Sequence, residues 1–186
     1  MSRRIALLLS AALIASLSFF AAPTALSVVV CFGSNATITG TSGDDTLTGT
    51  AGNDVIVGLG GQDSITGGDG NDKICGMDGN DFLLKGNAGS DQIDGGSGID
   101  TVLGTGGNDS LFGGPEVDSV WGGNGDDDIH GDGDNDGLND GQGDDSLFGG
   151  SGANDTATLC PGDGFADFVD NSVENTNFHD NACTNL

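Results

Sequence analysis

Aliphatic side chains recur every nine residues over more than half of the chain. From Gly40 to Phe148, each unit has glycine at position one, a polar run with aspartate at position six, and one aliphatic residue at position eight. GTAGNDVIV (49–57) and GTGGNDSLF (104–112) are clear copies. Twelve copies fit this register, with Lys85 as one extra residue between the fifth and sixth copies. Low complexity alone does not hold two unlike residue types in phase over such a length.

Each unit divides into a turn and a very short strand. The first six residues are glycine and small polar types, which suit turns with positive φ, and the last three place one side chain inward and two outward. The inward residues are Leu47, Ile56, Ile65, Ile74, Leu83, Ile93, Val102, Leu111, Val120, Ile129, Leu138 and Leu147. Two units make one coil, so the pattern predicts an all-β fold, a parallel β-roll with a thin aliphatic core.

Aspartate fills position six of every copy. These residues are Asp45, Asp54, Asp63, Asp72, Asp81, Asp91, Asp100, Asp109, Asp118, Asp127, Asp136 and Asp145. One buried aliphatic residue per unit recovers less free energy than ordering nine residues costs, and stacked carboxylates repel one another. A bound cation would supply the difference. Calcium suits carboxylates and backbone carbonyls, whereas magnesium demands tighter geometry and zinc prefers His and Cys.

The pattern GGxGxDxUx resembles the RTX, or haemolysin-type, calcium-binding repeat over residues 40–158. The resemblance implies that calcium ions lie between the turns of repeats i and i+2, held by both position-six aspartates, for example Asp54 with Asp72, and by turn carbonyls. Glu116 and Asp134 replace the position-four glycine, and the extra residue shifts the phase, so sites at those turns depart from the pattern. No toxin or enzyme region accompanies the repeats.

The first residues differ from the rest. Arg3 and Arg4 precede an apolar run that ends at Pro23, which is typical of a secretory signal peptide. We predict a signal peptide at 1–27, a lead-in at 28–39, the repeat roll at 40–158 and a C-terminal cap at 159–186, in a secreted, extracellular protein. Cleavage after Ala25 and a retained membrane anchor are the alternatives; Val30 before the next cysteine disfavours a lipoprotein.

Four cysteines in an exported chain indicate disulfides. Of the three pairings, we favour Cys31 with Cys75, which ties the lead-in to an outward position-nine site, and Cys160 with Cys183, which closes the tail. Free thiols are the alternative. A thirteenth, longer copy (149–158) places Asp155 at the aspartate position, and in the tail Phe165, Phe168, Val169 and Val173 are expected to cover the end of the roll.

Charge limits the partners. A formal net charge of −25, or −27 once Arg3 and Arg4 are removed, excludes nucleic acid. DGDNDG (132–137) resembles the start of an EF-hand loop, but its twelfth position is Gly143 instead of glutamate, which favours a degenerate repeat. Histidines 130 and 179 are the only two and no nucleophile set accompanies them, so we predict no enzyme.

We therefore predict a monomeric, calcium-binding β-roll that folds when Ca2+ enters its turns. The alternative is a calcium-dependent adhesion module, in which the outward position-nine residues Phe112, Trp121, His130 and Phe148 bind a cell-surface glycan or protein partner.

Overall fold

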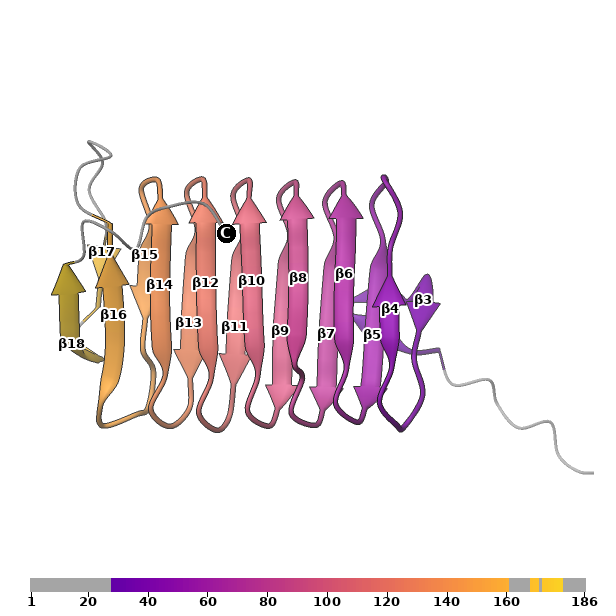
Figure 1. The fold of residues 1–186 in the computed structure, drawn as a ribbon, viewed down its shortest axis with the longest axis horizontal. Helices are drawn as coiled ribbons and strands as arrows, with labels where there is room; N and C mark the ends of the chain where they lie inside the picture. The colour runs from indigo at the N-terminus through magenta and orange to yellow at the C-terminus, as the bar shows by residue number, and fades with distance from the viewer. Residues whose placement is uncertain (1–27, 161–167, 171, 179–186) are drawn as a thin grey trace, which may run out of the picture.

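The computed structural model is a roll of two facing parallel sheets, which confirms the predicted fold class (Figure 1). It describes residues 28–160, 168–170 and 172–178. Every regular element in these residues is a strand, and none of them forms a helix long and apolar enough to cross a membrane. The predicted signal peptide, Phe165, His179 and Cys183 lie outside the described residues.

The two large sheets each contain eight strands, and we call them front and back as Figure 1 views them. The front sheet contains β4 (Thr46–Thr48), β6 (Ser64–Asp69), β8 (Leu83–Ala88), β10 (Thr101–Gly106), β12 (Ser119–Asn124), β14 (Gly137–Gln142), β16 (Asp155–Leu159) and β18 (Val173–Phe178). The back sheet contains β3 (Ile38–Thr39), β5 (Val55–Gly60), β7 (Lys73–Asp78), β9 (Gln92–Ser97), β11 (Ser110–Gly114), β13 (Asp128–Asp132), β15 (Ser146–Phe148) and β17 (Phe168–Val169).

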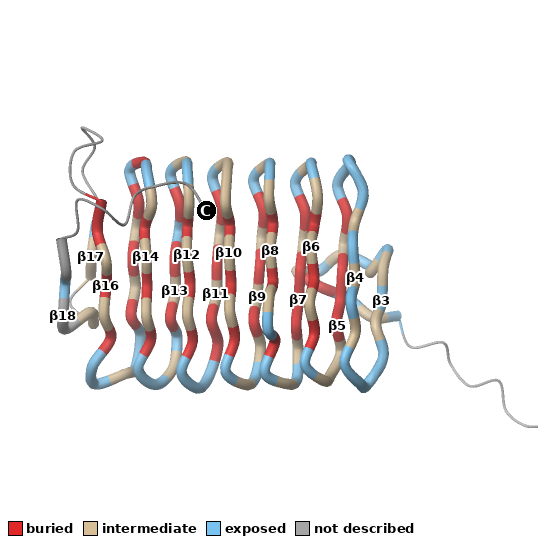
Figure 2. The backbone as a smooth tube through the Cα atoms, in the orientation of Figure 1, coloured by how far each residue is buried: buried red, intermediate tan, exposed pale blue. Residues whose placement is uncertain are grey.

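Successive repeats alternate between the sheets, so each strand pairs with the strand two repeats away. Val102 lies beside Val120 in the front sheet, and Leu111 lies beside Ile129 in the back sheet. The position-eight side chains point inward and form one continuous core, in which Ile56, Ile93 and Ile129 are fully buried. In Figure 2 burial runs through both sheets, while the turns at the two edges are exposed.

The extra residue of the repeat lies at Phe82, not at Lys85 as the sequence predicted. Leu84 is fully buried and pairs with Ile65 and Val102, so it fills position eight in place of Leu83. The Phe82 and Leu83 amides both donate to the Asp63 carbonyl oxygen, at 3.0 and 3.4 Å. Two residues thus oppose one, as in a β-bulge, and the bulge leaves the Phe82 side chain 75% exposed.

A small hairpin packs on the outer face of the back sheet. β1 (Val30–Cys31) and β2 (Ser34–Asn35) are antiparallel, and Phe32 and Gly33 between them both have positive φ, as a type I′ turn requires. The predicted disulfide between Cys31 and Cys75 is present. Because the hairpin covers it, the outward residue Val57 is fully buried.

The far end of the roll continues both sheets beyond the repeats. β16 carries the buried Ala157 at position eight, and β17 and β18 pair in parallel with β15 and β16. Val169 and Val173 pack against the core there, whereas Phe168 is 55% exposed. The other predicted disulfide includes Cys183, which lies outside the described residues.

Candidate metal centres

The position-six aspartates form two ladders, one along each turn edge of the roll. Each aspartate closes a turn at the start of a strand, so its position follows the sheet that the strand enters. The ladder of the front sheet contains Asp45, Asp63, Asp81, Asp100, Asp118, Asp136 and Asp155. The ladder of the back sheet contains Asp54, Asp72, Asp91, Asp109, Asp127 and Asp145.

After the first aspartate of each ladder, one carboxylate oxygen of each aspartate joins neighbouring coils. The Asp63 amide donates a hydrogen bond of 2.9 Å to Oδ1 of Asp81, and the Asp109 amide donates one of 2.8 Å to Oδ1 of Asp127. The eleven ladder bonds from Asp45 to Asp155 measure 2.7 to 2.9 Å. Aspartates of repeats i and i+2 are therefore direct neighbours, which is the spacing that the family resemblance implied.

In most of the ladder aspartates the other carboxylate oxygen is buried and lacks a hydrogen-bond partner. Within the described residues this holds for Oδ2 of Asp63, Asp72, Asp81, Asp91, Asp100, Asp109, Asp118, Asp127, Asp136 and Asp155. A buried polar atom without a hydrogen bond costs about 1–3 kcal/mol, and more when it is charged. A row of such atoms is the strongest sign that these turns hold something besides protein.

Position-one glycines leave room beside these oxygens. A Cβ atom added to Gly58 would lie 2.2 Å from Oδ2 of Asp63 and 2.9 Å from the carbonyl oxygen of Gly76. At Gly104 the same distances are 2.3 Å to Oδ2 of Asp109 and 2.6 Å to the carbonyl oxygen of Gly122. A carboxylate oxygen and a carbonyl oxygen of the next coil therefore approach the same point, which only a residue without a side chain permits.

Burial raises the pKa of most of the ladder carboxyls. Desolvation is the main cause, and it outweighs the backbone hydrogen bond that each carboxylate accepts; neighbouring ladder carboxylates add to the rise. The pKa reaches about 8 at Asp118 and Asp127 and about 7 at Asp109. Asp54, near the start of its ladder, shows the opposite: hydrogen bonds from Thr50 lower its pKa. The carboxylates in the interior of the ladders therefore most need a positive charge nearby in order to ionise.

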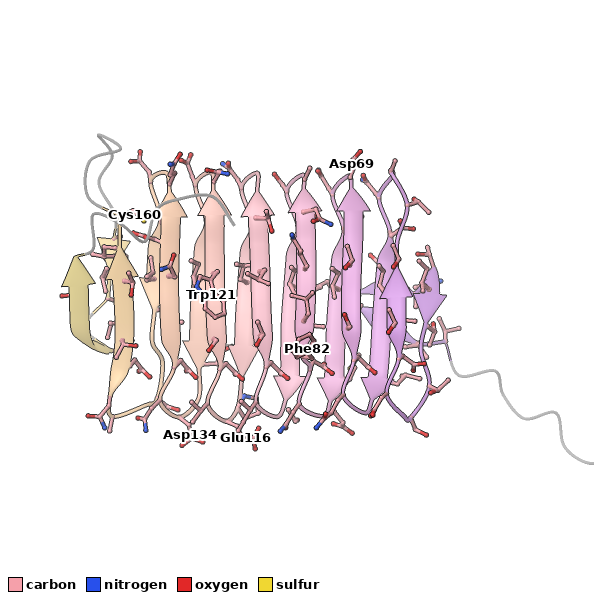
Figure 3. All side chains as sticks on the ribbon, viewed as in Figure 1. Asp69, Phe82, Glu116, Trp121, Asp134 and Cys160 are labelled. Atoms are coloured by element: carbon pink, nitrogen blue, oxygen red, sulfur yellow. A yellow bond between two sulfur atoms is a disulfide. The ribbon has the colours of Figure 1, made fainter. Side chains whose placement is uncertain are left out.

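The two turns that depart from the glycine pattern keep its geometry. Glu116 and Asp134 adopt positive φ values of 78° and 64°, and glycine also has a positive φ at position four of most other copies. The aspartates that follow them, Asp118 and Asp136, remain in the ladder and are joined by a bond of 2.8 Å. Figure 3 shows Glu116 and Asp134 at the same turn edge. The substitutions therefore leave the ladder intact at these turns.

The donor set fits a hard divalent cation. No three His, Cys, Asp or Glu side chains converge as a metal site within the described residues, so two ladder carboxylates would have to be completed by backbone carbonyls. Oxygen donors of this mixed kind suit Ca2+, which accepts six to eight oxygens in flexible geometry. The ladder offers neither imidazole nor thiolate, the ligands that zinc prefers.

The first two copies differ in a way that the repeat pattern did not reveal. Thr41 and Thr50 stand at position two, and each donates both its amide and its hydroxyl to Oδ2 of the aspartate in its own repeat, Asp45 or Asp54. These carboxylates are partnered within the protein. Threonine at position two is not a sufficient signal in the sequence, because Thr105 holds the same position and its hydroxyl is buried without a hydrogen-bond partner in the described residues.

Asp140 is a buried carboxylate that the sequence did not single out as functional. It replaces the glycine at position one, is 1% exposed and accepts hydrogen bonds from the amides of Gly141 and Cys160. The ladder itself extends one repeat further, because Oδ1 of Asp155 accepts the Asp136 amide at 2.9 Å.

The outward aromatic residues fall into two groups. On the back sheet, His130 stacks between Phe112 and Phe148, with ring centroids 4.8 and 4.7 Å away and planes within 15°. Phe32 and Phe168 extend the stack at its two ends. The predicted stripe is therefore present, but its ring faces are occupied by one another. Trp121 lies on the front sheet, outside this stack.

Comparison with known families identifies the repeat. The model of the RTX calcium-binding nonapeptide repeat matches residues 32–65, 48–83, 83–102, 103–138 and 138–155. Together these segments cover the turns that carry the ladder aspartates from Asp45 to Asp155. A search of curated proteins gave no significant match.

Proposed function

Because the chain belongs to the RTX calcium-binding nonapeptide repeat family, we propose that it is a secreted protein whose roll folds when Ca2+ binds between successive turns. The proposed ligands are the twelve position-six aspartates, from Asp45 to Asp145, with carbonyl oxygens of the glycine turns. Asp155 extends the set by one repeat.

The unpaired Oδ2 atoms of the ladders carry this proposal. They are buried, adjacent to bare glycine backbone, and unable to ionise together without opposing charge. Calcium would let each carboxylate ionise and would bridge one coil to the next.

Coupling between binding and folding follows from the same atoms. Without a cation, the turns bring acidic groups together with little apolar burial to compensate, whereas a cation that binds only the folded turns stabilises the roll by mass action. In a calcium-poor cytoplasm the chain would stay extended, as export requires, and it would fold in a calcium-rich extracellular medium. We retain residues 1–27 as the signal peptide, 28–39 as the lead-in, 40–158 as the roll and 159–186 as the cap.

Far-UV circular dichroism of the mature, oxidised protein tests the proposal. We expect a cooperative gain of β signal on addition of Ca2+, reversal by chelator and no equivalent change with Mg2+. Isothermal titration calorimetry in parallel would count the bound ions. A spectrum that is already rich in β structure in excess chelator and indifferent to calcium would refute ion-driven folding.

We propose no catalytic role. His130 is held between two phenylalanine rings, and its Nε2 atom lies 3.2 Å from Oδ1 of Asp128, a carboxylate oxygen that can only accept a hydrogen bond. We also propose that the protein is a monomer, with calcium as its principal ligand.

A further inference from the structure

From β4 to β16, the outer face of the front sheet carries no acidic side chain, although the protein is strongly acidic. From β4 to β16 its outward positions form two columns, at positions seven and nine of the repeats. The position-seven column is Thr46, Ser64, Leu83, Thr101, Ser119, Gly137 and Thr156. The position-nine column is Thr48, Thr66, Lys85, Leu103, Trp121, Asn139 and Thr158. No aspartate or glutamate occurs in either column, although the chain contains 29.

The back sheet does not share this property. Asp94 and Asp128 point outward from it, the hairpin covers one end, and the stacked rings of Phe112, His130 and Phe148 occupy much of the rest. The two turn edges carry many acidic groups of the described residues, including Asp69, Glu116 and Asp134 (Figure 3). A face without acidic side chains, on which Lys85 is the one charged residue, is therefore a specific feature of the front sheet and not a general result of the repeat.

Trp121 stands near the middle of this face. It lies beside Leu103 on β10 and Asn139 on β14, and its side chain is partly exposed (Figure 3). Among the described aromatic residues it stacks with none, unlike the rings of the back sheet. No described aromatic ring covers its indole, and hydroxyl and amide groups lie in the same columns.

We propose that the outer face of the front sheet binds a neutral polysaccharide, with one sugar ring stacked on Trp121. An indole face packs against the C–H face of a sugar, and serine, threonine and asparagine side chains match sugar hydroxyls as donors and acceptors. Parallel strands about 4.8 Å apart repeat these groups in straight rows, which favours an extended polymer.

Charge selects against the other classes of partner. The net charge of −25 repels anionic polysaccharides at long range, and a basic protein would find its complement on the turn edges instead of this face. The face also has only Leu83, Leu103 and Trp121 as large apolar residues, less than the apolar core of a typical protein interface.

This inference extends the proposed function, since the face exists only while the roll is folded. The test uses the mature, oxidised protein in saturating calcium, with circular dichroism run on each sample to confirm folding. Retention on insoluble cellulose, chitin and an unsubstituted β-glucan is measured alongside titration with their soluble oligosaccharides. Because Trp121 is the only tryptophan and the chain has no tyrosine, its fluorescence reports on this face alone.

We expect retention on at least one neutral polymer, a shift of the Trp121 emission with its oligosaccharide, and at least a tenfold loss of affinity in Trp121→Ala. Phe168→Ala, which removes an exposed aromatic ring from β17 of the back sheet, is the matched control and should bind normally. Asn139→Asp adds a carboxylate to the face while keeping Trp121, and should also weaken binding.

Failure of this inference is separable from failure of the calcium proposal. A folded protein that is retained by none of the three polymers, or that binds equally well as Trp121→Ala, overturns the polysaccharide face and leaves calcium-driven folding standing. Preferential retention on a basic protein or an anionic polymer overturns it as well. If circular dichroism shows a roll that needs no calcium, the binding assay is run in chelator and judged by the same outcomes.

Discussion

The amide of Asp54 donates a 2.8 Å hydrogen bond to Oδ1 of Asp72, eighteen residues further along the chain and one coil further along the roll. The bond fixes the orientation of the Asp72 carboxylate and leaves its Oδ2 atom buried without a hydrogen bond within the described residues. The same side chain thus serves as a structural link between coils and as a candidate cation ligand. The two roles can be separated by substitution.

Asp109→Asn should preserve the link and weaken the site. The amide oxygen can still accept the Asp91 amide, which now donates to Asp109 at 2.8 Å, but the side chain no longer carries charge. We expect loss of about one bound ion or a several-fold rise in the calcium midpoint, measured by calorimetry and circular dichroism. Asp69→Asn removes the same charge from an exposed position and should leave the number of bound ions and the calcium midpoint unchanged. Equal effects of the two substitutions would mean that the ladder acts only through the net charge of the protein.

Protons should compete with calcium. Burial raises the pKa of Asp118 and Asp127 from 3.8 to about 8, so without calcium the roll binds more protons than the unfolded chain between about pH 4 and pH 8. Stability without calcium therefore falls as pH rises through that window. We expect more β signal in chelator at pH 5 than at pH 8, a weaker calcium midpoint at pH 5, and proton release on binding, measured by calorimetry in two buffers. An apo spectrum that loses β signal on acidification would contradict the assigned direction.

Gly104→Ala should be severely destabilising. Its new Cβ would lie 2.3 Å from Oδ2 of Asp109 and 2.6 Å from the Gly122 carbonyl oxygen, and it would fill the space beside the candidate ligands. We expect a loss of at least about 2 kcal/mol in the free energy of unfolding, measured with urea in saturating calcium. Gly106→Ala is the control, because its nearest contact is the Asn87 carbonyl oxygen at 3.6 Å. Similar losses of stability in both variants would show that Gly104 is needed for its backbone conformation and not for the space beside Asp109.

Removal of the disulfide in the variant Cys31→Ala/Cys75→Ala should destabilise the first coils. The bridge spans 44 residues, and closing a loop of that size stabilises a fold by about 4 kcal/mol in the chain-entropy description. Urea unfolding of the variant and the oxidised parent, both in saturating calcium, measures the difference. Hydrogen exchange should show the loss concentrated in β1, β2, β5 and β7. A uniform loss over the whole roll would indicate that the hairpin acts on every coil at once.

Much of the fold follows from the period of the sequence, because a nine-residue repeat with one aliphatic position leaves few ways to stack. The error at Leu83 has a physical cause. Phe82, Leu83 and Leu84 are three apolar residues in a row, and periodicity alone cannot decide which of the last two points inward when an extra residue is present. The bulge, in which Phe82 and Leu83 both oppose Asp63, places the Leu84 side chain inward.

The features of the site that could not be predicted from the sequence depend on contacts between coils. The position-six aspartates were recognisable from spacing, but their division into a bonded Oδ1 and an unpaired Oδ2 depends on the coil two repeats away. Likewise, the repeat pattern predicts that every position-nine side chain points outward into solvent. Val57 and Cys75 are nevertheless buried, because the hairpin packs over them. Local patterns cannot report which outward side chains a distant segment will cover.

The disulfide-linked hairpin also gives the folding of the roll a direction along the chain. Each coil in the middle of the roll bonds only with the coil before it and the coil after it, so its growth resembles one-dimensional polymerisation, in which a first unit is costly and later units add to an existing template. Cys31 and Cys75 join the hairpin to β7, near the N-terminal end. We therefore expect the hairpin to act as the seed, with coils added from there toward β18.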